Sequence, residues 1–142
     1  MKQKKLKDKA FTLVELLVVI VLLALIATVV VPKFFTGLEE QKRKIARMGI
    51  VNIEDALHRF YIDCGRFPDD SEGLEALIIA PPDLEEKWRG AYLKRSQLMD
   101  PWDNPYIYVA EGEVNPGSFD LISYGADGEP GGEGDNEDVY ND

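Results

Sequence analysis

An apolar run from Phe11 to Val31 limits what this chain can be. It reads FTLVELLVVIVLLALIATVVV, and apart from two threonines its one polar residue is Glu15. At about 1.5 Å rise per residue, a helix of this length spans roughly 30 Å, which is the hydrocarbon core of a bilayer. The run therefore predicts a membrane-spanning helix. Glu15 is its anomaly, because an ionised carboxylate inside hydrocarbon costs roughly 2.5 to 3.5 kcal/mol unless a cation pairs with it.

The ten residues before the run predict its orientation. They contain five lysines and one aspartate, and such a positive excess holds its side of a membrane helix in the cytoplasm. The residues after Pro32 are then expected outside. A basic tract before an apolar run also begins a cleaved secretory signal peptide. That alternative is disfavoured, because this run is longer than the usual signal core and has no clear small-x-small site before Pro32.

The residues KDKA (7–10) followed by FTLVE (11–15) resemble the class III signal of type IV pilins and type II secretion pseudopilins. The resemblance implies that a prepilin peptidase cuts between Ala10 and Phe11 and that Phe11 becomes an N-methylated first residue. It also implies that Glu15 pairs with the terminal amine of a neighbouring subunit, since opposite charges attract strongly in a low-dielectric site. The family has glycine where this chain has Ala10, so slower cleavage is expected.

Composition restricts the outer part to one compact domain of about 110 residues. The formal net charge is −10, and twelve acids but no Lys or Arg follow Arg95. Nucleic acid is therefore not an expected partner. No catalytic motif stands out, and the single histidine, His58, has no Cys or His cluster beside it, so the chain is not expected to be an enzyme. The single cysteine, Cys64, is either a buried thiol, which we favour, or an intermolecular disulfide partner.

The helix is expected to continue to about Asp63, with a kink at Pro32. Along it, apolar residues recur at steps of three and four, as on the core-facing side of an amphipathic helix: Ala46, Ile50, Ile53, Leu57, Phe60 and Cys64. Its other side carries a charged run over residues 39–47. In a monomer that run is a solvated face, and in a filament it is a salt-sensitive contact between subunits.

After the helix the sequence predicts a short helix over residues 73–77, capped by Ser71, and two or three antiparallel strands that include 106–109 and 118–124. Gly65 and Pro68 end the long helix. The passages GRFP (65–68), GLEAL (73–77) and DPW (100–102) resemble the major pseudopilins. General type IV pilins share the N-terminal motif of this chain but not these passages. Trp102 is expected to pack in the core. The family usually has glycine where Asp103 stands.

Glycines and acids alternate from Gly125 to Asp138. Such a stretch can present carboxylates and carbonyls to a hard cation with six to eight oxygen ligands, for which calcium is the natural candidate. The spacing is not that of an EF-hand, and by itself an acidic glycine-rich segment is more often disordered. The resemblance to the calcium loop of the major pseudopilins implies Asp127, Asp135 and Asp138 as side-chain ligands, together with backbone carbonyls near Tyr124.

Taken together, these features predict an α+β, type IV pilin-like fold with three parts. Residues 1–10 form a cytoplasmic leader, 11–32 a transmembrane and assembly helix, and 33–142 a periplasmic pseudopilin domain with a short antiparallel sheet and a calcium loop. The resemblance implies a single-pass protein of the bacterial inner membrane that forms a helical homo-oligomeric filament for protein export, with minor pseudopilins and an inner-membrane assembly platform as partners. The alternatives are a type IV pilin for adhesion or motility and a monomeric, membrane-anchored calcium-binding module.

Overall fold

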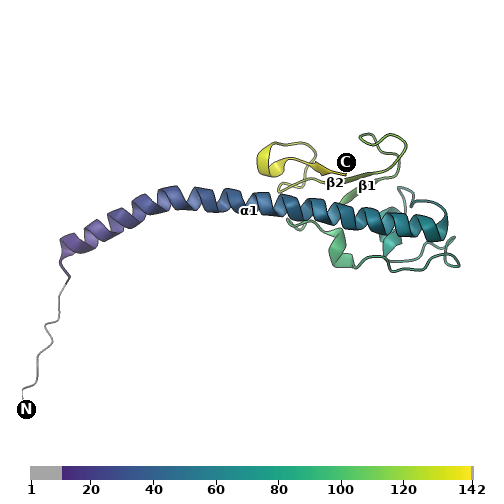
Figure 1. The fold of residues 1–142 in the computed structure, drawn as a ribbon, viewed down its shortest axis with the longest axis horizontal. Helices are drawn as coiled ribbons and strands as arrows, with labels where there is room; N and C mark the ends of the chain where they lie inside the picture. The colour runs from purple at the N-terminus through teal and green to yellow at the C-terminus, as the bar shows by residue number, and fades with distance from the viewer. Residues whose placement is uncertain (1–10, 142) are drawn as a thin grey trace, which may run out of the picture. The chain divides into compact units, whose positions relative to one another are not determined.

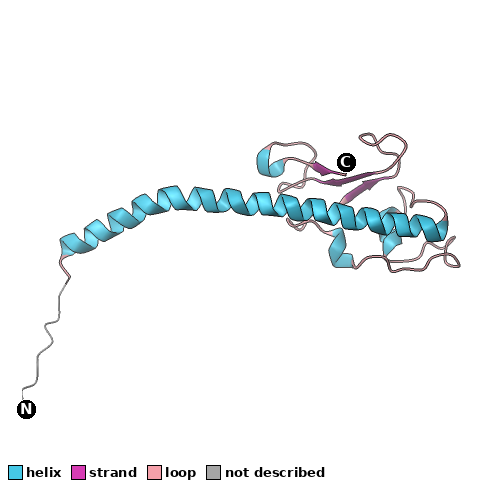
Figure 2. Cartoon of the chain, in the orientation of Figure 1, coloured by secondary structure: helices cyan, strands magenta, loops and turns pink. Residues whose placement is uncertain are grey.

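The computed structural model describes residues 11–141, except for the side chains of residues 33–36. Its secondary structure is one long helix, three short 3-10 helices and three short strands (Figures 1 and 2). In chain order these are α1 (Leu13–Cys64), η1 (Gly73–Leu77), η2 (Arg95–Leu98), β1 (Ile107–Val109), β2 (Asp120–Ser123), η3 (Gly134–Asn136) and β3 (Val139–Tyr140). The predicted α+β class, with a long N-terminal helix and a short antiparallel sheet, is confirmed. The chain forms two compact units, Met1–Leu38 and Glu39–Asp142.

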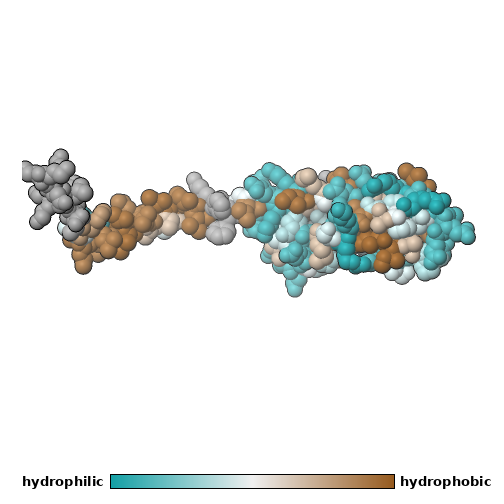
Figure 3. Space-filling view, turned by 90° about the horizontal axis from the view of Figure 1, so that it is seen from below, coloured by the Kyte–Doolittle hydropathy of each residue, from teal (hydrophilic) through white to brown (hydrophobic). Residues whose placement is uncertain are grey.

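In the first unit, the described side chains from Phe11 to Pro32 are all exposed. Apolar surface covers this stretch of α1 on the face seen in Figure 3. Within the described residues, α1 is the one helix long and apolar enough to cross a membrane. The helix assignment continues through Pro32 without a break.

In the second unit, α1 packs one side onto the core. All six residues of the predicted apolar face are buried, and Ile53, Leu57 and Phe60 are fully so. The helix ends where predicted: Gly65 adopts φ +82°, a conformation that favours glycine, and its N–H donates to the Tyr61 carbonyl at 2.8 Å. Cys64 is a free, buried cysteine, as favoured from its sequence context.

A glycine allows the closest contact between α1 and the rest of the domain. A Cβ on Gly49 would stand 2.0 Å from the Tyr106 hydroxyl oxygen, so only glycine leaves room for that ring. The Tyr106 hydroxyl donates to the Ala46 carbonyl at 3.1 Å. Burial raises the pKa of Tyr106 to about 12, which keeps the hydroxyl protonated as a donor.

The sheet has the order β1-β2-β3, and both pairs are antiparallel. Central β2 is buried at all four positions. Ile122 is opposite Ile107 on one side and Tyr140 on the other, so β3 joins the sheet just after the acidic segment. Asn141 extends this attachment, because its side-chain oxygen accepts from the Leu121 N–H at 2.8 Å and its amide donates to the Phe119 carbonyl at 3.1 Å.

Two local expectations need revision. Ser71 does not cap the short helix at 73–77; Asp69 Oδ1 instead accepts hydrogen bonds from the Ser71 N–H, the Ser71 hydroxyl and the Glu72 N–H. Asp69 makes these bonds because its side chain reaches the free N–H groups that lie two and three residues ahead in the turn. Trp102 is only half-buried, and its indole N–H donates to Glu39 Oε2 at 2.8 Å, which ties the turn at residues 100–105 to α1.

Candidate functional site

The first described turn of α1 contains Glu15, and the structure gives this residue a local partner. The Thr12 N–H and hydroxyl donate to Glu15 Oε2 at 2.9 and 3.1 Å, and the Glu15 N–H donates to the Thr12 hydroxyl oxygen at 3.2 Å. This reciprocal pattern is a capping box, in which the first and fourth residues satisfy each other's free backbone N–H groups. The T-x-x-E spacing carries that signal, and our reading of the sequence missed it.

The capping box leaves the charge of Glu15 without a cation. Among residues 11–141, no ion pair involves Glu15, whose hydrogen bonds are to the N–H and hydroxyl groups of Thr12. Phe11 is 80% exposed, and Ala10 lies outside the described residues. Thr12 therefore orients the carboxylate at the start of the helix without neutralising it.

The second candidate site is the acidic loop, which we define as residues 125–138. All five of its glycines have positive φ, between 63° and 96°. At Gly132 a Cβ would lie 2.5 Å from the Asn136 carbonyl oxygen, and at Gly125 it would lie 3.0 Å from the Asp135 carbonyl oxygen. The loop therefore folds back on itself so tightly that side chains at these two positions would not fit.

Asp138 is the proposed ligand that the fold holds most firmly. Its Oδ2 accepts hydrogen bonds from the Gly131 N–H at 2.9 Å and the Tyr140 hydroxyl at 3.2 Å. Burial, together with the nearby Asp138 charge, raises the pKa of Tyr140. The other oxygen, Asp138 Oδ1, is buried, and no group of the described residues forms a hydrogen bond with it. A buried carboxylate oxygen without a partner is costly, and a cation would satisfy it.

The remaining predicted ligands do not gather around Asp138. Asp127 is exposed, and its Oδ1 accepts from the Glu129 N–H at 3.1 Å. Asp135 is exposed in η3, and its carbonyl accepts from the Ala126 N–H at 3.1 Å. Tyr124 is half-buried just before the loop. In the part of the chain that the structure describes, no three His, Cys, Asp or Glu side chains stand close enough to form a metal site.

The residues present nevertheless fit a hard cation in one respect. Calcium binds backbone carbonyls as readily as carboxylates, so a site here does not require three acidic side chains. The unpartnered Asp138 Oδ1 supplies one strong oxygen donor, and the loop folds back so that the Asp135 carbonyl lies near Gly125 and the Asn136 carbonyl near Gly132. Asp127, Asp135 and the Tyr124 carbonyl are the further oxygen donors the sequence offers.

The acidic loop is fastened to α1 by Arg43, a contact that the sequence did not reveal. The Arg43 guanidinium donates to the Gly134 carbonyl and pairs with Glu137 Oε2 at 2.8 Å. A second connection begins at the loop's first residue, where the Asn104 amide donates to the Gly125 carbonyl at 3.0 Å. Asn104 belongs to the turn that Trp102 ties to α1. The loop is thus held at both of its ends.

Two models of known families match the chain. The description "Type II secretion system (T2SS), protein G" applies to the match over residues 33–142, and "Prokaryotic N-terminal methylation motif" to the match over residues 5–31. Together they cover almost the whole sequence.

Individual relatives match over similar lengths. The type II secretion system core protein G of Vibrio cholerae serotype O1 is 38% identical over 141 residues, covering 98% of this chain and 94% of the relative. The core protein G of Pseudomonas aeruginosa is 38% identical over 138 residues, covering 95% of each chain. The crystal structure of the major pseudopilin from the type 2 secretion system of enterohaemorrhagic Escherichia coli superposes with a TM-score of 0.62. That match has 28% identity and covers 80% of this chain and 96% of the solved one.

Proposed function

The chain belongs to the type II secretion system protein G family, the major pseudopilins, and we propose that it polymerises into a periplasmic filament that drives export of folded proteins across the outer membrane. Members of this family are structural subunits of the secretion pseudopilus and not enzymes. Polymerisation and its coupling to export are the proposed steps.

The observation that carries the proposal is the first unit of the chain. Each described side chain from Phe11 to Pro32 is exposed, and all but a few are apolar. Water does not tolerate so large a continuous apolar surface, so lipid or other copies of the helix must cover it. The same segment serves the subunit before and after assembly. It anchors the subunit in the inner membrane beforehand, and it packs against neighbouring helices in the filament.

Processing prepares this segment for assembly. The methylation motif over residues 5–31 supports cleavage by a prepilin peptidase between Ala10 and Phe11. Cleavage creates a terminal amine four residues before Glu15. The capping box presents Glu15 at the helix start, where it pairs with that amine on a neighbouring copy. The second unit then lies in the periplasm, and minor pseudopilins and an inner-membrane platform direct assembly.

Calcium is the proposed cofactor of the acidic loop. Asp138 Oδ1 would bind it, with Asp127, Asp135 and the Tyr124 carbonyl as further ligands. The ion would supply positive charge to a loop that contains six acids and no Lys or Arg. Magnesium should substitute poorly, because it requires a tighter octahedral shell than a glycine-rich loop provides.

Replacing Glu15 by leucine tests the assembly step. Glu15→Leu removes a charge from the membrane segment, so insertion should be intact or improved, whereas filaments should be lost. Electron microscopy of overproducing cells measures filaments, and membrane fractionation measures insertion. Thr12→Ala is the matched control, because it removes the capping box and keeps the charge; it should assemble better than Glu15→Leu.

Three outcomes contradict parts of the proposal. Filaments of normal yield from Glu15→Leu would refute the charge pairing. An absence of filaments from the parent chain would favour the monomeric calcium-binding module. Filaments that do not restore secretion in a strain lacking its own major pseudopilin would favour a type IV pilin role in adhesion or motility.

A further inference from the structure

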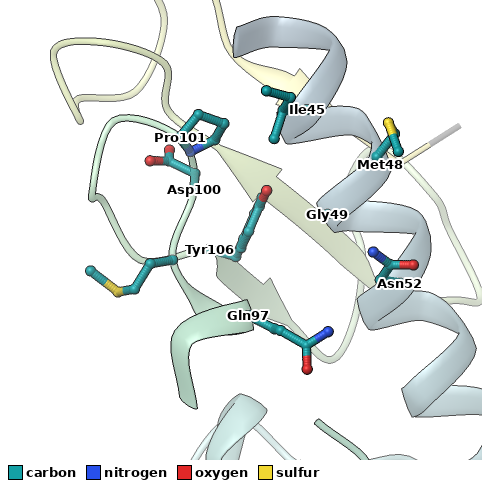
Figure 4. A pocket seen from close by; sticks show the side chains of 9 residues that line it. Ile45, Met48, Gly49, Asn52, Gln97, Asp100, Pro101 and Tyr106 are labelled. Atoms are coloured by element: carbon teal, nitrogen blue, oxygen red, sulfur yellow. The ribbon is translucent and has the colours of Figure 1, made fainter. Parts of the chain in front are cut away.

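An apolar groove opens on the second unit, between α1 and the segment that follows η2. Figure 4 shows its lining, with Ile45 and Met48 on the helix side and Pro101 on the other. Its volume is about 270 Å³. Three large apolar side chains around it are exposed to water: Ile45 at 55%, Met48 at 65% and Met99 at 43%.

The groove is a built feature of the fold. Tyr106 lines it, and that ring is held under α1 by the bond from its hydroxyl to the Ala46 carbonyl, which the absence of a side chain at Gly49 permits. The opposite wall is fixed by the Asp100 N–H, which donates to the Asn104 carbonyl at 2.8 Å. A partner would therefore meet a preformed surface and would lose little entropy in ordering it.

The same unit presents an exposed apolar side chain on a turn outside the groove. Val114 is 56% exposed in the turn between β1 and β2. The buried carboxylate of Asp120 fixes this turn, because it accepts the N–H groups of residues 113, 114 and 115 at 2.7, 2.9 and 2.9 Å. With its backbone N–H groups held inward, the turn displays Val114 on a rigid support directly after the acids Glu111 and Glu113.

Charge favours contact between these two surfaces on different copies. Four basic residues, Lys42, Arg43, Lys44 and Arg47, begin one turn before the groove wall, and of these Arg43 is already bound to the acidic loop, whereas no Lys or Arg follows Arg95. Lys44 pairs with Glu40 at 3.2 Å, and both side chains are exposed. Such an exposed pair is weak, so Lys44 can exchange partners.

We infer that the groove receives the Val114 turn of a second copy of this chain, an inference that rests on the proposed polymerisation. The β1–β2 turn and η2 lie on different sides of α1 in Figure 1. A contact between two different surfaces of identical subunits is head-to-tail, and it repeats into an open filament. Val114 fills the apolar groove, and Glu111 and Glu113 meet the basic stretch of α1. The contact adds to the packing of the N-terminal helices and fixes the register of neighbouring domains.

Opposite charges introduced on the two surfaces test the inference in the full-length, processed chain. Met48→Glu should lower filament yield at least about tenfold, because a carboxylate buried in an apolar groove readily costs one decade in affinity. Val114→Lys should do the same, and the double variant should recover most of the yield. Ile79→Glu, at a residue 60% exposed outside the groove, is the matched control and should assemble like the parent. Because Met48 and Val114 are exposed, the melting of each variant should match the parent.

Cross-linking gives a second readout. Met48→Cys and Val114→Cys, made in separate co-expressed chains, should be joined by a short bismaleimide, while buried Cys64 stays unreactive. Filaments of the two co-expressed cysteine variants that give no cross-linked dimer, or a Met48→Glu variant that assembles normally, would overturn the groove contact and leave the proposed polymerisation intact. A parent chain that forms no filaments would overturn both.

Discussion

Replacing Asp138 by asparagine should separate the metal-free and calcium-bound states of the acidic loop. Without metal, the buried and unpartnered Asp138 Oδ1 carries a desolvation penalty of about 1–3 kcal/mol. An asparagine oxygen can still accept the Gly131 N–H, and its neutral amide replaces the unpartnered charged oxygen. In chelator, Asp138→Asn should therefore melt within a few degrees of the parent.

In calcium the two proteins should diverge. A ligand at a hundredfold excess over its Kd stabilises the folded state by about 2.7 kcal/mol. One kcal/mol shifts the Tm of a domain of this size by about 4 to 8 °C, so the parent should gain about 10 to 20 °C. Asp138→Asn should gain little, because it lacks the strongest proposed donor. Circular dichroism of the purified chain in detergent measures both shifts, and protease cleavage near Gly131 should fall with calcium in the parent alone.

Glu111→Gln is the control for this experiment, since it removes one exposed acid outside the loop and should respond to calcium like the parent. Equal melting temperatures of the parent in calcium and in chelator would refute the metal site. A calcium response of Asp138→Asn as large as the parent's would leave calcium in place but remove Asp138 from the ligand set.

Three further predictions address processing and stability. The mature chain should begin at Phe11, and Ala10→Gly should speed cleavage; intact-mass spectrometry over time checks both, and a mature protein that retains Met1 would contradict them. Gly49→Ala should destabilise the domain by about 1–3 kcal/mol in urea unfolding, because the added Cβ meets the Tyr106 ring; unchanged stability would mean that Tyr106 has another place to pack. Burial raises the pKa of Asp120, but the N–H groups of residues 113 to 115 outweigh it and hold the pKa below its usual value. The stability that this carboxylate contributes should thus be complete above about pH 4, the pKa of the unfolded chain, and should be lost as pH falls through the lower pKa of the folded chain. Asp120→Asn should be less stable than the parent by about 2 kcal/mol at pH 7, and its stability should lack that acid dependence. Urea titrations at several pH values measure the difference.

The long helix could be predicted from the sequence because its two halves carry strong, simple signals. Twenty-one consecutive residues with one charge predict a membrane helix, and apolar steps of three and four from Ala46 to Cys64 predict the core face. The strands were predicted less exactly, and both were too long. β1 begins at Ile107, because Tyr106 packs under α1 instead. β2 begins at Asp120, whose carboxylate accepts N–H groups of the turn that precedes the strand.

The contacts that position the candidate sites were beyond sequence reasoning. Arg43 belongs to a charged run that reads as a solvated face, and only the path of the chain places Gly134 and Glu137 beside it, about ninety residues later. The resemblance implied the acidic ligands as a set, but neither it nor the spacing predicted that Asp138 would have a buried oxygen that no described group hydrogen-bonds. The capping box at Thr12 could have been predicted, because Thr12 and Glu15 have the T-x-x-E spacing.

The attachment of β3 has a consequence for the order in which the domain folds. Central β2 receives its second partner only when residues 139–140 arrive, and Asn141 then bonds the strand at Leu121 and Phe119. Synthesis from the N-terminus delivers these residues after every other element of the domain. Until they emerge, one edge of β2 stays open. The sheet therefore remains incomplete until residue 141 has been delivered, and folding of this domain finishes at its C-terminal end.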